Sequence, residues 1–196
     1  MSNGPATHPP PESDLLELAR RGDPAVWERI VSEFGPVIRG YARARGVRDP
    51  DDLTQDVFVA AASRLGDFRG DWGDFRSWMF AVAYRQIVNR YRRAKFDAAP
   101  LPETLPATGE PLEDQVIERL QGDTAVAALV VLSDLERDVV LMRVLGGLDT
   151  EDVARAVGKR AGNVRVIQSR AMGKLRAELI RRGYGTEGLT SVEAVG

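Results

Sequence analysis

The segment DDLTQDVFVAAASRL, residues 51–65, carries three carboxylates close enough in sequence to suggest acid–base catalysis. Such a site also needs a histidine, a metal or a positioned nucleophile nearby. The chain has no cysteine, and its single histidine, His8, lies in a Pro-rich leader. Asp52 and Asp56 are separated by about one helical turn, with Gln55 beside them. We therefore expect a protein-contact surface here and no catalytic residue.

A second segment, SWMFAVAYRQIVNRYRRAK, residues 77–95, intersperses basic with aromatic residues and contains no acid. This combination suits single-stranded nucleic acid, because cations follow the phosphate backbone and aromatic rings stack on bases. The competing interpretation is that the rings belong to a core. Trp78, Phe80 and Tyr84 recur at helical spacing and should face inward at least in part. The arginines are therefore the firmer candidates for binding.

The C-terminal part of the chain has the pattern of a helix-turn-helix. A helix over 135–145 should stop at the glycine pair that follows it. Asp149 should cap a short second helix that Gly158 ends, and a third helix should begin near Ala161. Its buried face should comprise Val164, Ile167, Ala171 and Leu175. The turn and third helix carry the cations Lys159, Arg160, Arg165, Arg170, Lys174, Arg176, Arg181 and Arg182.

Positive charge of this kind meets phosphates, and side chains near the start of such a helix reach base edges. Within this basic stretch Glu178 is the one acid. The alternative interpretation is a solvated basic helix in a plain three-helix bundle.

These segments must be positioned by helices, since no stretch shows the alternation of a β-strand. We predict an all-α chain of two small helical domains joined by a flexible linker, with the helix-turn-helix in the second. The linker carries four prolines and no apolar periodicity. The predicted parts are a disordered leader over 1–13, a first domain over 14–96, a linker over 97–111, a second domain over 112–182 and a tail over 183–196.

Composition narrows the function further. The 196 residues carry a formal net charge of −2, which argues against a bulk polyanion binder. Without cysteine and with one histidine, thiolate zinc sites and Ser-His-Asp triads are not expected. The chain's glycines follow no strand and precede no Gly-Lys-Ser/Thr, so a phosphate-binding loop is not expected. We expect no cofactor, metal, signal peptide or membrane insertion, and hence a cytoplasmic protein.

Three motifs, in this order, resemble the extracytoplasmic-function (ECF) group of bacterial sigma factors. DLTQDVF resembles the helix that binds the polymerase clamp, and FRGDWGDFRSWMFAVAY resembles the loop and helix that open the minus-ten promoter element. LSDLERDVVLMRVLGGLDTEDVARAVGKRAGNVRVIQSRAMGKL resembles the domain that reads the minus-thirty-five element. The resemblance covers roughly residues 14–96 and 112–182. It implies a transcription initiation factor, not an enzyme, whose partners are core RNA polymerase, promoter DNA (duplex and melted strand) and an anti-sigma factor.

The resemblance also implies roles for three sets of residues. The polymerase-binding set is Asp52, Leu53, Gln55, Asp56 and Phe58. The set for the melted minus-ten strand is Arg69, Trp72, Arg85, Gln86, Asn89, Arg90 and Arg93. The set for the minus-thirty-five duplex is Lys159, Arg160, Asn163, Arg165, Val166, Ser169, Arg170 and Lys174.

Several positions depart from the family pattern. Arg85 stands where the family often has Asn, and Val166 with Ile167 replaces a common Ser-Arg pair. Val166 donates no hydrogen bond from its side chain, so we expect a thymine methyl contact or none. The promoter sequence therefore does not transfer from relatives.

Two other functions compete with this interpretation. An autonomous helix-turn-helix repressor or activator would leave the acidic and the aromatic-basic segments unexplained. Tight, specific binding to duplex promoter DNA without polymerase would favour it. A small hydrolase is the third possibility, which the absence of cysteine and the single leader histidine disfavour.

Overall fold

Helices make up all of the regular structure in the described part of this chain. The computed structural model describes residues 12–97 and 123–183. This confirms the predicted all-α class. In chain order the elements are α1 (Glu12–Arg20), α2 (Pro24–Ala44), α3 (Pro50–Arg64), α4 (Trp72–Asp97), α5 (Asp123–Ala128), the 3-10 turn η2 (Leu129–Val131), α6 (Asp134–Val144), α7 (Thr150–Val157) and α8 (Ala161–Arg181).

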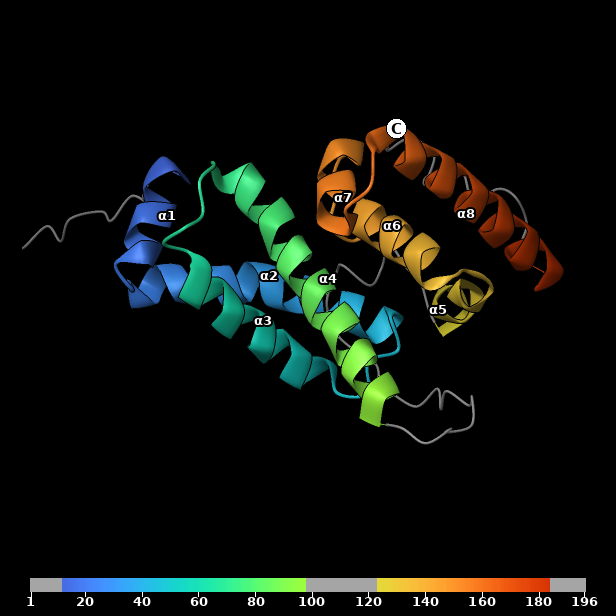
Figure 1. Ribbon diagram of the computed structural model, residues 1–196, viewed down its shortest axis with the longest axis horizontal. Helices are drawn as coiled ribbons and strands as arrows, with labels where there is room; N and C mark the ends of the chain where they lie inside the picture. Colours follow the sequence, from blue (N-terminus) through green and yellow to red (C-terminus); the bar gives the residue numbers. More distant parts are fainter. Residues whose placement is uncertain (1–11, 98–122, 184–196) are drawn as a thin grey trace, which may run out of the picture.

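The first unit packs α1 to α4 around an apolar core (Figure 1). Asp23 caps α2 by accepting hydrogen bonds from the backbone N–H groups of Ala25 and Val26, and Pro24 occupies the first helical position. Both features are typical of a helix start, because a carboxylate satisfies free N–H groups and proline has none to lose. The largest buried side chains of this unit include Phe34, Tyr41, Leu53, Phe75 and Phe80.

Helix α4 begins at Trp72, five residues before the aromatic-basic segment 77–95. Two aspartates fix this start by capping each other's backbone. The N–H of Asp74 donates to Asp71 Oδ1 at 2.9 Å, and the N–H of Asp71 donates to Asp74 Oδ2 at 3.1 Å. Gly70 precedes them at φ +148°, where an added Cβ would lie 2.7 Å from Asp74 Cβ. A glycine is therefore required for this close approach.

The second unit contains α5 to α8. Asp149 caps α7 by accepting from the N–H of Asp152 at 2.7 Å, and Gly158 ends α7 in the left-handed conformation at φ +66°. Both were predicted from sequence. Ser133 and Glu136 form a reciprocal capping box at the start of α6, which the sequence analysis did not anticipate.

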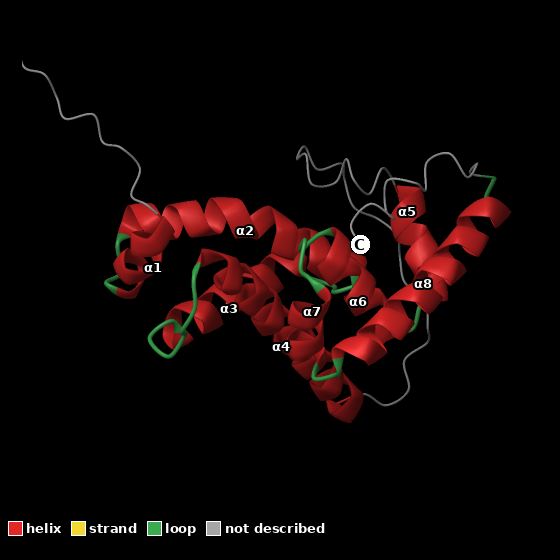
Figure 2. Ribbon diagram, turned by 90° about the horizontal axis from the view of Figure 1, so that it is seen from above, coloured by secondary structure: helices red, strands yellow, loops and turns green. Residues whose placement is uncertain are grey.

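The two units pack against each other (Figures 1 and 2). Helix α4 contacts α7, and α2 contacts α6. The turn after α6 approaches Phe80 of α4 so closely that a Cβ at Gly146 would lie 3.0 Å from the Phe80 ring. The apolar core therefore continues from one unit into the other.

The predicted leader, linker and tail lie largely outside the described residues, and the domain boundaries stay predictions. Only their edges are described: α1 begins at Glu12, α4 ends at Asp97, and a turn closes at Gly183.

Candidate functional site

The acidic face of α3 is exposed but already paired within the chain. The side chains of Asp52 and Asp56 are 59% and 50% exposed. Arg90 of α4 places Nη2 at 2.6 Å from the Asp52 carboxylate and 2.5 Å from that of Asp56. Gln55 is exposed beside them. Docking through this face would therefore exchange Arg90 for a partner's cation.

Two of the residues assigned to polymerase binding lie deeper. Leu53 is fully buried in the core, so its assignment as a contact residue is wrong. Phe58 is partly buried and packs against the core. Leu53 contributes by holding α3 in place, while Phe58 remains partly exposed.

Trp72 also belongs to the core, which corrects its assignment to the minus-ten strand. Its ring stacks on Phe75 with centroids 5.4 Å apart and lies 5.9 Å from that of Phe34. A buried and stacked ring has no free face for a base. Arg69 remains exposed, but its Nη1 donates to the carbonyl oxygens of Gly66 and Phe68 at 2.7 and 2.8 Å. Arg69 therefore stabilises the loop between α3 and α4 through these hydrogen bonds.

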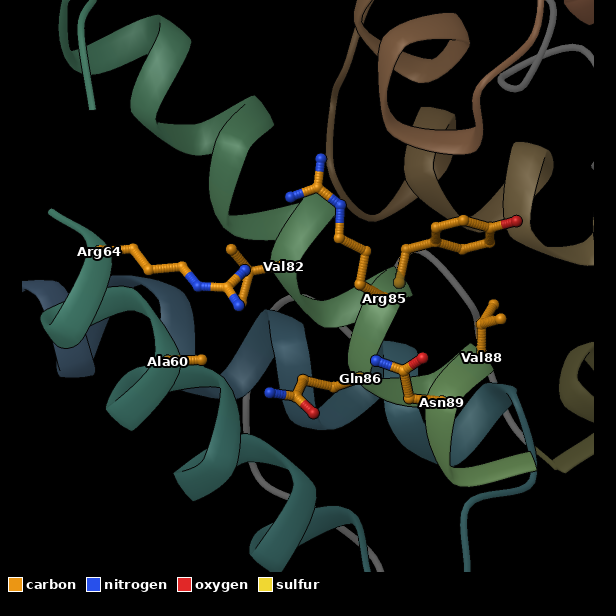
Figure 3. Close-up of a pocket in the computed structure, with 8 residues that line it drawn as sticks. Ala60, Arg64, Val82, Arg85, Gln86, Val88 and Asn89 are labelled. Carbon is orange, nitrogen blue, oxygen red and sulfur yellow. The ribbon is translucent and has the colours of Figure 1, made fainter. Parts of the chain in front are cut away.

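A pocket of about 290 Å³ opens between α3 and α4; we call it the α3–α4 pocket (Figure 3). Gln86 and Asn89 bring amide groups to its lining, and Figure 3 shows Arg64 reaching across from α3 toward Val82 of α4. Its lining residues are Ala60, Arg64, Val82, Tyr84, Arg85, Gln86, Val88 and Asn89.

Arg64 and Arg85 are the two cations of the α3–α4 pocket, and both are exposed. Within the described residues, neither makes a hydrogen bond or ion pair. Arg85, Gln86 and Asn89, three of the residues assigned to the minus-ten strand, line this pocket together. Arg90 points instead to the acids of α3, and Arg93 is exposed one turn further along α4. Sequence analysis missed Arg64, because no local pattern shows which end of α3 faces α4.

The helix-turn-helix of the second unit has the expected division of faces. Val164, Ala171 and Leu175 are buried and Ile167 is partly buried, as predicted. The opposite face of α8 and the preceding turn are exposed, including Lys159, Arg160, Asn163, Arg165, Val166, Ser169, Arg170 and Lys174.

Two cations of this face are paired with acids from neighbouring helices. Arg165 Nη2 lies 2.9 Å from Glu151 of α7, and Lys174 Nζ lies 2.8 Å from Glu136 of α6. The Lys174 ammonium lowers the pKa of the Glu136 carboxyl through this hydrogen bond. The Arg165–Glu151 pair is exposed and contributes at most about 1 kcal/mol, so a phosphate can replace Glu151.

The basic residues at the end of α8 have a structural role. Arg181 and Arg182 both bind the Glu178 carboxylate, at 2.6 and 2.7 Å. Arg181 and then Arg182 lower the pKa of Glu178 to about 2. Arg182 also donates to the carbonyl oxygen of Ala127 at 3.1 Å, which ties α8 to α5. The nucleic-acid candidates of α8 therefore lie in its first four turns.

Neither a membrane span nor a metal centre emerges from the described residues. No described helix combines the length and apolar character that a membrane span requires. The same residues bring no three His, Asp or Glu side chains into a metal-binding group.

Comparison with known proteins agrees with this arrangement. The chain matches the family Sigma-70 region 2 over residues 30–96 and the family Sigma-70, region 4 over residues 128–177. It is 30% identical over 179 residues to the ECF RNA polymerase sigma factor SigD of Mycobacterium tuberculosis, covering 86% of this chain and 84% of SigD.

Two solved structures share the fold. The first is CnrH in complex with the cytosolic domain of CnrY, at a TM-score of 0.63 and 25% identity over 87% of this chain and 97% of that one. The second is RpoE of Bartonella quintana in complex with the anti-sigma factor NepR, at a TM-score of 0.60 and 21% identity over 78% of this chain and 96% of that one. The matched regions and the SigD relationship show that this chain belongs to the extracytoplasmic-function group of bacterial RNA polymerase sigma factors, the non-enzymatic factors of promoter-directed transcription initiation.

Proposed function

We propose that three separate surfaces of this sigma factor bind polymerase, the minus-ten element and the minus-thirty-five element. The acidic face of α3 docks on core RNA polymerase, the α3–α4 pocket captures unpaired bases of the minus-ten element, and the first half of α8 contacts the minus-thirty-five duplex. The observation that carries the proposal is the α3–α4 pocket, because it combines a cavity with two free cations and two amides.

Removing a base from its stack costs a few kcal/mol of free energy. Contacts between the base and the pocket must compensate for this cost. The amides of Gln86 and Asn89 each offer donors and an acceptor to a base edge. Arg64 and Arg85 offer planar cations that pair with phosphate or lie against a base. The walls of Ala60, Val82 and Val88 add apolar surface.

On α8, Arg165 and Arg170 differ in direction by about 140° around the helix, so both cannot face one base pair. Arg165 is held by Glu151 at 2.9 Å, whereas Arg170 makes no ion pair within the described residues. We assign guanine contact to Arg170 and phosphate contact to Arg165. Val166 and Ser169 lie between them on the exposed face.

The docking partner of α3 must present cations that compete with Arg90 for Asp52 and Asp56. Core polymerase is the partner that the family indicates, with the protein acting in the cytoplasm. An anti-sigma factor that covers the same face would exclude polymerase, and the RpoE neighbour is itself a complex with such a factor.

Run-off transcription with core polymerase and a promoter library randomised at both elements tests the proposal. Arg85→Ala and Asn89→Ala should each change base preference at one minus-ten position, because a stacked or hydrogen-bonded base contributes roughly 1–3 kcal/mol. Arg21→Ala is the matched control, since Arg21 is exposed and pairs with Glu17, remote from the pocket in sequence. Full activity with unaltered preference in both pocket variants would show that the pocket holds no base.

A further inference from the structure

A buried polar contact joins the two units. Tyr41 of α2 donates its hydroxyl to Asp138 Oδ1 of α6 at 2.7 Å, and Nε of Arg45 lies 2.6 Å from the same oxygen. Tyr41, Arg45 and Asp138 are 0%, 3% and 2% exposed. We call these three residues the interdomain latch. Ionisable groups are seldom buried unless they are paired, so this cluster defines how the units meet.

The guanidinium of Arg45 has further neighbours. Its Nη1 lies 2.9 Å from Asp134, whose side chain is 80% exposed, and its Cζ lies 5.4 Å from the ring centroid of Tyr91. Tyr91 also donates its hydroxyl to the Arg45 carbonyl oxygen at 2.5 Å. Arg45 and Tyr91 thus belong to the first unit, and both carboxylates come from the second.

We propose that the interdomain latch holds the free sigma factor in a closed form and must open when polymerase and promoter are engaged. This inference rests on the proposed function. The two promoter elements are centred about 25 base pairs apart, or about 85 Å at about 3.4 Å per base pair. A compact chain of 196 residues has a radius of gyration of about 16 Å, far below half of that distance. The closed form therefore cannot reach both elements, and the units must separate.

The ion pair of the interdomain latch can separate at a small net cost in free energy. A buried ion pair recovers in Coulomb attraction roughly what its two charges lost in hydration, so it fixes geometry more than it adds stability. When the units separate, Arg45 and Asp138 return to water and regain that hydration. A second inter-unit contact, from the Ser77 hydroxyl to the Asp152 carboxylate, lies at the α4–α7 contact and is only partly buried.

Energy transfer between two dyes on the free protein tests the proposal. The chain has no cysteine, so Ser63→Cys on α3 and Ala177→Cys on α8, both exposed, provide two unique labels. Asp138→Arg places two cations together in the closed form and should shift the equilibrium on the order of 100-fold toward the open form, seen as a loss of transfer. Helical content should be retained, because residue 138 becomes an exposed helix position when the units separate.

Glu28→Arg is the matched control, because it makes the same charge reversal at an exposed position of α2 and should leave transfer high. The double variant Arg45→Glu with Asp138→Arg reverses the pair and should restore transfer. In the unaltered labelled protein, saturating core polymerase with promoter DNA should lower transfer.

Three results would overturn the proposal. They are high transfer in Asp138→Arg, unchanged transfer on binding polymerase and promoter, and loss of helical content in Asp138→Arg without recovery in the double variant. Because transfer in the free protein does not depend on promoter contacts, a chain that opens normally but fails in transcription contradicts the proposed function instead.

Discussion

Acidification should favour the closed form of this sigma factor, because Asp138 binds a proton more tightly there. Burial raises the pKa of the Asp138 carboxyl to about 6, against the opposing effects of Arg45 and of the Tyr41 hydrogen bond. In the open form the carboxyl is exposed, and its pKa returns to about 3.8. Protonation of Asp138 therefore stabilises the closed form. This stabilisation is fully present below pH 3.8 and is lost as the pH rises through about 6. The charged and titratable groups around Asp138 are Tyr41 from α2 and Arg45 at its C-terminal cap, Tyr84 and Tyr91 from α4, and Asp134 and Arg137 from α6 itself.

The magnitude follows from the two pKa values. A difference of about 2 pKa units corresponds to about 3 kcal/mol between the fully protonated and the fully ionised limits. Between pH 7 and pH 5, a single site with these values changes the closed-to-open ratio about tenfold. Dye transfer in the labelled protein, followed over that range, measures the change.

Asp138→Asn is the control for this titration. It keeps an acceptor for Tyr41 and Arg45 but removes the ionisable group, so its transfer should vary little between pH 5 and pH 7. A closed fraction that rises with pH in the parent, or an equal slope in Asp138→Asn, would refute the assignment of the titration to Asp138.

Three further results are expected. Asp56→Arg should weaken binding to core polymerase with circular dichroism unchanged, whereas Asp51→Arg on the same helix should bind as the parent does; equal affinities would remove the acidic face from docking. Leu53→Ala should lower the free energy of unfolding by about 2–5 kcal/mol in a denaturant titration, because it leaves a cavity in a fully buried site, and a change below about 1 kcal/mol would place Leu53 outside the core. Arg170→Ala should relax preference at one minus-thirty-five position, whereas Arg165→Ala should weaken all promoters alike and lower the salt slope by about one unit; even losses in both variants would mean that neither arginine reads sequence.

Signals carried by a few neighbouring residues indicate where several helices begin and end. Asp23 followed by Pro24 marks the start of α2, and Asp149 and Gly158 bound α7, because caps and left-handed turns act within one helical turn. The apolar repeat of α8 likewise predicted its buried face. Leu53 could also have been placed correctly, since it shares an apolar stripe with Val57 and Ala61.

Contacts between distant segments could not be predicted in this way. Asp138 is one acid among several near the start of α6, and nothing around it indicates a partner 93 residues away at Arg45. The partners of Arg90, Arg165 and Lys174 also lie on other helices. Net charge along a helix therefore overestimates the cations that are free to meet DNA, because tertiary packing decides which acids lie beside them.

Arg90 also reduces the electrostatic attraction that the acidic face of α3 exerts on an approaching molecule. The Arg90 guanidinium lies within 2.6 Å of the carboxylates of both Asp52 and Asp56. The three groups together therefore carry a net charge of −1, whereas the two carboxylates alone would carry −2. Beyond a Debye length of about 8 Å, so small a charge gives little electrostatic steering. The association rate at this face should accordingly vary little with ionic strength. Selectivity among basic surfaces then resides in the dissociation rate, after Arg90 has exchanged its partners.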